Sequence, residues 1–121
     1  MEVFEERRRL REEAIRRARD WADSLKFRAT AILIGSYARG DFNLWSDVDI
    51  LLVGEFTGNP LERLKAIDYP PGFEVIPLTI DELTRLVRRR DPLATEASKI
   101  GVYLRDDLDV RRILECLASM G

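Results

Sequence analysis

Two apolar segments close together in the chain place the strongest constraint on its fold. The segments "AILIG" (residues 31–35) and "VDILLV" (residues 48–53) are almost free of polar side chains. Short apolar runs bounded by glycine or by loop residues predict strands that are buried in a sheet. The second run nevertheless contains Asp49, and Asp47 stands just before it. A chain that keeps two carboxylates at the edge of its own core needs a chemical reason for them.

Strands and helices are predicted to alternate along the whole chain. Apolar residues recur at spacings of three, four or seven from Glu2 to Leu25, which predicts an amphipathic helix whose interspersed Arg and Glu face solvent. Further strands are expected at 29–35, 47–53, 73–79 and 102–106, and helices at the "GSYARG" turn, 60–67, 79–90, 91–100 and 107–120. Pro77 places the third strand at its end or at a sheet edge. The pattern predicts an α/β (α+β) fold, a small mixed sheet of about four strands with helices packed on it.

Size and composition narrow the class of protein. With 121 residues, of which 45% are hydrophobic, the chain suits a single domain spanning 1–121. Its net charge of −2 excludes a global basic surface, so any RNA contact requires a local patch. We expect a cytoplasmic protein without a membrane partner, because no signal peptide or long apolar run is evident. The 17 Arg against 3 Lys are compatible with a thermophile or with GC-rich coding.

The absence of histidine limits the chemistry available to this protein. Catalytic triads that use histidine and metal sites built on imidazole are excluded. The single cysteine, Cys116, lies in the helical pattern "ILECLA", where we expect a buried structural thiol. Any catalysis must therefore rely on carboxylates, hydroxyls, Arg, Lys or a hard metal ion.

Asp47 and Asp49 are the first candidate site residues. Side chains two residues apart on a strand project to the same face, with Cα atoms roughly 6.6 Å apart. Two carboxylates on one face favour a cation between them, and oxygen ligands alone select Mg²⁺ or Mn²⁺. Such a pair can hold two ions about 3.5–4 Å apart, as phosphoryl or nucleotidyl transfer requires. The alternative is that Asp47 caps the strand and Asp49 faces solvent on a one-sided sheet.

Gly35 and Ser36 stand where a strand ends and a helix begins, a place that attracts anions. Glycine allows a phosphate to approach the backbone, and the Ser36 hydroxyl can donate a hydrogen bond to it. Arg39, one helical turn further on, can pair with phosphate. The alternatives are an ordinary capped turn and, for Arg39, a surface cation that balances Asp41. Because the two aspartates follow on the next strand, triphosphate and metal can meet at one end of the sheet.

Glu74 offers a third carboxylate, in the apolar segment "GFEVIPL". An acid in a buried strand is costly unless it is paired or bound to metal. If its strand lies beside that of Asp49, Glu74 can ligate the metals or take the proton from an attacking hydroxyl. The alternative is an edge strand with the acid facing water.

The composite motif "GSYARGDFNLWSDVDILLV" resembles the signature of the nucleotidyltransferase superfamily related to DNA polymerase beta, and most closely its minimal nucleotidyltransferase (MNT) proteins. The resemblance covers Ala31–Val53 and extends through Thr79. It implies the nucleotidyltransferase fold and a Mg²⁺-dependent transfer of a nucleoside monophosphate, with ATP as donor, to a hydroxyl group. By position, Gly35 and Ser36 would hold the triphosphate, and Asp47 and Asp49 the metals. Glu74 departs from the family, which usually has a third Asp there.

The resemblance also implies a partner. Minimal members act as antitoxins that adenylylate a separately encoded helical HEPN ribonuclease, so an HEPN-type protein would bind this chain in trans. The main alternative is a catalytically weak nucleotide-binding module that acts by binding its partner, a reading that Glu74 keeps open. Modification of a small molecule and tailing of RNA are further alternatives, and a homodimer is compatible with the composition although no residue demonstrates it.

Overall fold

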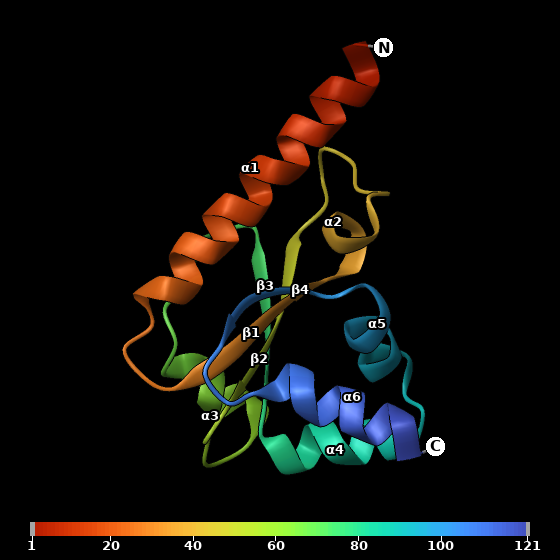
Figure 1. Ribbon diagram of the computed structural model, residues 1–121. Helices are drawn as coiled ribbons and strands as arrows, with labels where there is room; N and C mark the ends of the chain where they lie inside the picture. The colour runs from red at the N-terminus through yellow and green to blue at the C-terminus, as the bar shows by residue number, and fades with distance from the viewer. Residues whose placement is uncertain (1, 121) are drawn as a thin grey trace.

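β1 (Ala29–Ile34) and β2 (Val48–Gly54) form the centre of a four-stranded sheet, with β3 (Phe73–Leu78) and β4 (Val102–Asp106) at its edges. The structure is a computed structural model that describes residues 2–120. Its helices are α1 (Glu2–Ser24), α2 (Gly35–Arg39), α3 (Pro60–Lys65), α4 (Ile80–Arg88), α5 (Pro92–Ile100) and α6 (Val110–Met120) (Figure 1). The predicted α/β fold, a small mixed sheet with helices packed on it, is confirmed.

The pairing of the strands makes the sheet mixed. β1 is antiparallel to both β2 and β4, whereas β2 and β3 are parallel and are joined through α3. Asp49 pairs with Ile34 across β1 and with Glu74 across β3. Pro77 lies on β3, and this confirms the predicted edge position, where a missing N–H costs no ladder hydrogen bond.

Two apolar layers cover the two faces of the sheet. On one face, Trp21 and the alanines of α1 pack against Ala31, Leu33 and Ile50. On the other face, residues of α4, α5 and α6 pack against Ile32, Leu51 and Val53. Figure 1 shows the strands between α1 and these three helices. Because successive strand residues alternate between faces, Asp49 and Glu74 belong to the face that α4, α5 and α6 cover.

Three local features differ from the sequence-based expectations. Asp47 lies just before β2, since the strand begins at Val48, so strand alternation does not orient its side chain. β1 ends at Ile34, and Gly35 is already the first residue of α2. The expectation that Cys116 is buried is wrong, because this residue is exposed. Within residues 2–120, no helix has the length and apolar character needed to cross a membrane.

Candidate active site

Three carboxylates gather at the end of the sheet where β2 and β3 begin. Asp49 is the second residue of β2 and Glu74 the second residue of β3, and the two are direct neighbours in the parallel register. Asp47 lies just before the start of β2 and, like Glu74, is exposed. Within residues 2–120, these three acids form no ion pair with any Lys or Arg. The predicted site residues Asp47, Asp49 and Glu74 are therefore brought to one end of the sheet without a compensating cation.

The electrostatics of Asp49 reflect this arrangement. Burial, followed by the negative charge of Glu74 and a hydrogen bond shared with its carboxyl group, raises the pKa of Asp49 from 3.8 to about 6. The charges of Asp47 and of Glu96, on α5, act in the same direction. A carboxylate that resists ionisation because it is partly buried and because like charges surround it gains from a bound cation. A cation bound by Asp49 and Glu74 would therefore stabilise the ionised form of Asp49.

Gly35 lies directly against Asp49. Its φ angle is +76°, a left-handed backbone conformation that favours glycine, and a Cβ atom added there would lie 2.1 Å from Oδ2 of Asp49. Any larger residue would have to displace the carboxylate. The structure therefore joins the two halves of the motif, because the glycine turn after β1 and the acid on β2 share one contact.

The first turn of α2 differs from the starts of the next three helices. Side-chain oxygens of Asn59, Thr79 and Asp91 accept backbone N–H bonds at the starts of α3, α4 and α5. At α2 no side chain caps the N-terminus. Backbone N–H groups after Gly35 and the half-buried Ser36 hydroxyl can therefore meet an anion there. The helix has only five residues, so its dipole adds little to this attraction.

Two arginines of α1 hold α2 in place from its other end. Arg11 donates to the carbonyl oxygens of Tyr37, at 2.7 Å, and Ala38, at 3.1 Å. Arg7 donates to the carbonyl oxygens of Gly40 and Phe42, at 2.9 and 2.8 Å. The charged surface of α1 was expected only to face solvent, but these two side chains satisfy carbonyl groups at the end of α2 and in the loop after it. They fix the turn that carries Gly35.

Arg39 takes part in two ion pairs. Its Nε lies 3.1 Å from Oδ2 of Asp41, which is the alternative predicted from the sequence, and its guanidinium also contacts Glu96 of α5. Glu96 was not predicted as a site residue, since it lies far from the motif in the chain. The buried residues Ala94 and Ala97 and the closely packed Gly101 bring α5 against β1. This spacing of small residues was the only signal in the sequence for the approach of Glu96.

A basic cavity adjoins the Arg39–Glu96 pair. Its volume is about 620 Å³, and it is lined by Arg39, Arg90, Pro92, Thr95, Glu96, Lys99 and Ile100. Arg90 and Lys99 form no ion pair within residues 2–120. Arg90 also has a φ angle of +56°, at a helix C-terminus where glycine is favoured. The cavity therefore offers unpaired positive charge next to the acidic end of the sheet.

The donor atoms at the acidic end fit a hard divalent cation. Asp47, Asp49 and Glu74 provide carboxylate oxygens only, which are the ligands of Mg²⁺ and Mn²⁺. In the described part of the chain, no three His, Cys, Asp or Glu side chains already converge on one point in a way that could hold a metal ion. The match to a divalent cation thus depends on the oxygen donors and on the negative charge around Asp49 that no cation compensates within residues 2–120. Asp49 and Glu74 are already neighbours in the sheet.

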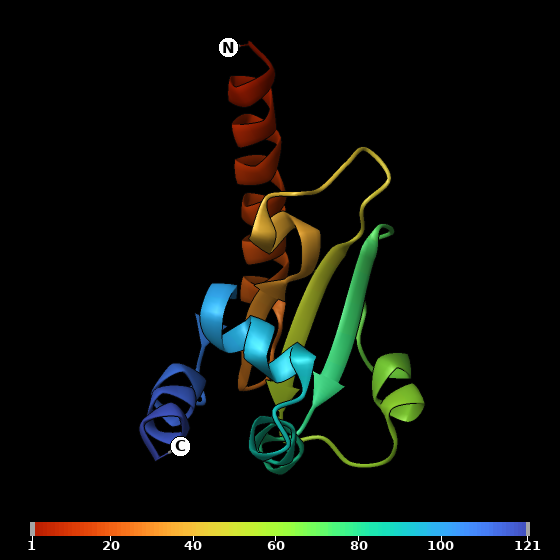
Figure 2. The ribbon, with the colours of Figure 1, turned by 90° about the vertical axis from the view of Figure 1, so that its right-hand side faces the viewer.

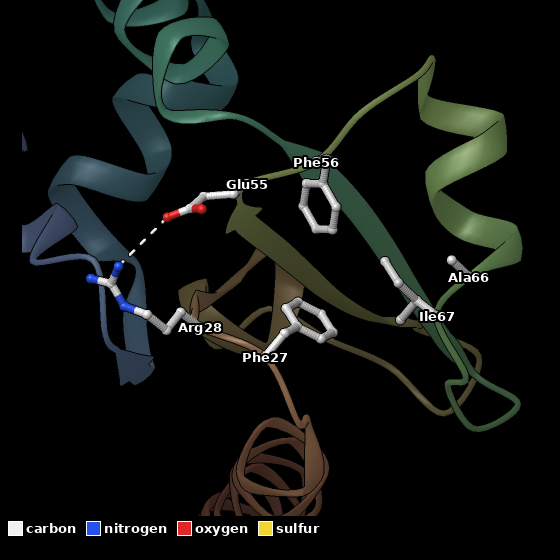
Figure 3. A pocket seen from close by; sticks show the side chains of 6 residues that line it. All are labelled: Phe27, Arg28, Glu55, Phe56, Ala66 and Ile67. Carbon is white, nitrogen blue, oxygen red and sulfur yellow. Dashed lines mark ion pairs between the residues drawn. The ribbon is translucent and has the colours of Figure 1, made fainter.

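A second cavity lies at the opposite end of the β1–β2 ladder. It measures about 440 Å³ and is lined by Phe27, Arg28, Glu55, Phe56, Ala66 and Ile67 (Figure 3). Arg28 and Glu55 form an exposed ion pair of 3.5 Å across it, and the rings of Phe27 and Phe56 meet edge to face. The acid here, Glu55, pairs with Arg28, whereas Asp47, Asp49 and Glu74 form no ion pair within residues 2–120. The candidate active site is therefore the acidic end of the sheet.

A glycine turn in contact with paired carboxylates, beside a basic cavity, defines a site suited to phosphoryl or nucleotidyl transfer. The nucleotidyltransferase domain family matches residues 13–116, and the chain therefore belongs to this family of enzymes. This finding confirms the family that the sequence motif resembles. No curated protein matches the chain.

The chain is similar to several solved structures. A protein from Sulfolobus solfataricus, described as a candidate nucleotidyltransferase, is 24% identical with a TM-score of 0.52, over 85% of this chain and 86% of that one. A toxin–antitoxin crystal structure with AMP-PNP is 19% identical, with a TM-score of 0.46, over 91% of this chain and 85% of that one. A mutant of the toxin–antitoxin MntA–HpeT is 16% identical, with the same TM-score and coverage. At these identities the first likeness shows the fold alone.

Proposed function

We propose that this nucleotidyltransferase transfers AMP from ATP to a hydroxyl group of a partner protein in the cytoplasm, and that Asp47, Asp49 and Glu74 hold Mg²⁺ or Mn²⁺. The contact between Gly35 and Asp49 carries the proposal. A triphosphate held at the Gly35 turn lies, through that contact, beside the carboxylates that would hold the metal. Bound there, the ion supplies positive charge to the phosphates and to the attacking oxygen.

Other residues of this chain would bind the phosphates and accept the proton. Backbone N–H groups after Gly35 and the Ser36 hydroxyl donate to phosphate oxygens, and Arg39 supplies charge to them. Arg90 and Lys99 give the adjoining cavity the charge to hold the polyphosphate end of the nucleotide. The acceptor oxygen forms a bond to the α-phosphorus, the bond from that phosphorus to the bridging oxygen breaks, and pyrophosphate leaves. The acceptor proton passes to a carboxylate, for which Glu74 is the exposed candidate.

The nature of the acceptor is proposed from the motif. The segment "GSYARGDFNLWSDVDILLV" resembles the minimal nucleotidyltransferases, whose partners are HEPN-type helical proteins. We therefore propose that the chain is the antitoxin of such a pair and that it modifies its partner in trans. The toxin–antitoxin proteins named above are neighbours of this fold, and the proposal does not depend on their similarity.

A second candidate function is a nucleotide-binding module that inhibits its partner by binding alone. Two observations favour it. Glu74 replaces the third aspartate of the family, and its extra methylene group moves the carboxylate by roughly one ångström. Arg39 is held by Asp41 and Glu96 rather than left free for phosphate.

One experiment separates the two functions. The purified protein, with Mg²⁺ and ATP labelled on the α-phosphate, is incubated in lysate of the source organism beside an Asp47→Asn plus Asp49→Asn variant. An Asp20→Asn plus Asp23→Asn variant, which changes two exposed acids of α1 that form no ion pair within residues 2–120, is the matched control. Label on a protein band with the native chain and the control, and none with the double variant, supports transfer to protein. Equal labelling by the double variant would sink the proposal, and no labelling despite Mg-ATP binding would favour the binding module.

A further inference from the structure

An exposed aromatic and an exposed aliphatic side chain stand next to the candidate active site. Leu44 and Trp45, in the loop between α2 and β2, each have 81% of their surface exposed. They frame a hollow of about 390 Å³ together with Asn43. Asp47 follows Trp45 by only two residues. Neither side chain contributes to the core, so the fold alone does not account for them.

The loop holds these two side chains in a defined position. Oδ1 of Asn43 accepts the backbone N–H of Trp45 at 2.8 Å, and Oγ of Ser46 accepts that of Asn43 at 2.9 Å. The backbone N–H of Ser46 returns to the carbonyl oxygen of Asn43 at 3.1 Å. A large apolar side chain on an already ordered turn loses little conformational entropy when it is buried against a partner.

The N-terminal part of α1 carries two further exposed apolar side chains at the same end of the molecule (Figure 1). Arg7 ties α1 to the loop through the carbonyl oxygens of Gly40 and Phe42, and its guanidinium lies 4.6 Å from the centre of the Phe42 ring. Val3 and Phe4 precede Arg7 by four and three residues, so they lie on the helix face that meets the loop. They are 67% and 78% exposed. Figures 1 and 2 show the start of α1 and this loop at the same end of the molecule.

We infer that Val3, Phe4, Leu44 and Trp45, here called the Trp45 patch, dock the protein that carries the acceptor hydroxyl. The inference rests on the proposed function and names the surface by which its acceptor is recognised. Trp45 stands two residues before Asp47, so a macromolecule whose hydroxyl group reaches the acidic end of the sheet can contact this patch. Aromatic residues surrounded by aliphatic ones are typical anchors of protein–protein interfaces.

The charges around the Trp45 patch indicate what the partner surface is like. Exposed Arg8 and Arg9 accompany the exposed Glu5 and Glu6 on α1, whereas the loop of residues 41–47 contains the exposed acids Asp41 and Asp47 and no cation. These acids repel the phosphates of an RNA acceptor, so the patch favours a protein over a nucleic acid. The complementary surface is apolar, is bordered by Arg or Lys, and presents a serine, threonine or tyrosine hydroxyl.

The test compares Trp45→Ala and Leu44→Ala with Leu61→Ala, a control that removes an equally apolar side chain, 64% exposed, from α3. Label transfer from ATP to the lysate protein is measured for each variant, together with binding of Mg-ATP to the purified chain. We expect Trp45→Ala to reduce transfer by about 10- to 100-fold and Leu44→Ala by less, in the range of interface anchor residues. Binding of Mg-ATP and transfer by the control should match the native chain.

Each outcome has a distinct meaning. Trp45→Ala and Leu44→Ala variants that label the acceptor as well as the native chain does overturn the docking surface and leave the proposed function standing. A native chain that labels nothing overturns the proposed function instead, and with it the acceptor that the patch was inferred to dock. Sedimentation of the native and Trp45→Ala chains adds a readout that needs no acceptor. A native dimer that Trp45→Ala dissociates would show that a second copy occupies the patch, contrary to the inference.

Discussion

Two carboxylates of this molecule, Asp49 and Glu82, have opposite electrostatic environments. Asp49, where β2 begins, has Glu74 as its neighbour, and its pKa is raised to about 6. Glu82, at the first turn of α4 beyond the other end of β3, contacts the buried Arg63 at 2.6 Å. This hydrogen-bonded contact, together with the N–H of Thr79, lowers the pKa of Glu82 to about 2.

Glu82 carries a charge that stabilises the fold, whereas Asp49 carries a charge that is available to a ligand. Glu82 has its cation built into the protein, and its partner Arg63 also donates to the carbonyl oxygen of Pro77 at 3.2 Å. The Arg63–Glu82 pair therefore links α3, β3 and α4. Within residues 2–120 Asp49 has no such partner, and Arg39 of α2 pairs with Asp41 and Glu96. An ionised carboxylate left without a cation beside other acids costs stability, and the cost is removed when the group is protonated or when a positive ligand binds.

The largest effect is expected from Asp49→Asn. Nucleotidyl transfer should fall by about a thousandfold, because the loss of several kcal/mol of charge stabilisation slows a reaction tenfold per 1.4 kcal/mol. The same change should stabilise the fold by about 1 kcal/mol above pH 6, after allowance for screening by solvent.

The sign of that stability change follows from the direction of the pKa shift. Folding raises the pKa of Asp49, so the folded state holds this proton more tightly than the unfolded state does. The free energy of unfolding of the native chain therefore falls as the pH rises from about 4 to about 6. Denaturant unfolding of native and Asp49→Asn chains at pH 4 and pH 7 should show a gap that widens with pH. A gap that narrows towards pH 7 would contradict the assignment.

Gly35→Ala should be the next most damaging change. The new Cβ atom would meet Oδ2 of Asp49 at 2.1 Å, and the φ angle of +76° adds strain of about 1–2 kcal/mol. Mg-ATP affinity, measured by calorimetry, should fall more than tenfold. Gly40→Ala is the matched control, because Gly40 has a φ angle of +93° and no atom within 4 Å of an added Cβ. Equal losses of affinity in both variants would mean that strain alone, and not contact with Asp49, explains the effect.

Glu82→Gln should reduce the free energy of unfolding by about 1–2 kcal/mol at pH 7, since Arg63 then remains buried beside a neutral group. Glutamine still completes the cap at Thr79. Glu62→Gln, in the corresponding capping box of α3, lacks a buried arginine partner and should have a much smaller effect. Because folding lowers the pKa of Glu82, its contribution is present above about pH 4.5 and should disappear as the pH falls to about 2. A loss that persists at pH 2 would exclude this origin.

Glu96→Gln should give the smallest effect. Glu96 is the weakest of the neighbours that raise the pKa of Asp49, so its removal should lower that pKa slightly. Carboxyl NMR titration of Asp49 in the absence of metal measures the change, with Glu62→Gln as the control. An unchanged or raised pKa would show that Glu96 does not act on the acidic end of the sheet.

The sequence predicted the fold well where local patterns decide it. Apolar runs located all four strands, and Pro77 correctly indicated an edge. The identity of the neighbours of Asp49 was only partly predictable. The pairing of Asp49 with Glu74 depends on the parallel crossover through α3, which the residues favour but do not fix. Whether Glu74 supports turnover is still a prediction.

Two features could not be predicted because they depend on tertiary packing or on helical phase. Glu96 reaches the site only because α5 packs closely on β1. Cys116 was judged from its apolar neighbours, but the inward stripe of α6 contains Val110, Ile113, Leu114 and Leu117 at helical spacing, and Cys116 lies outside it. The phase of the stripe, rather than local composition, determines burial of a single residue.

The position of β4 has a consequence for biosynthesis. β4 completes the sheet by pairing with β1, as in the contact of 2.8 Å between the Thr30 hydroxyl and Asp106. Every candidate residue of the active site is translated before this strand. Until β4 emerges from the ribosome, β1 has an unpaired edge of wholly buried residues, which is prone to aggregation. We expect the pairing of β4 with β1 to be the step that closes this edge and completes the sheet.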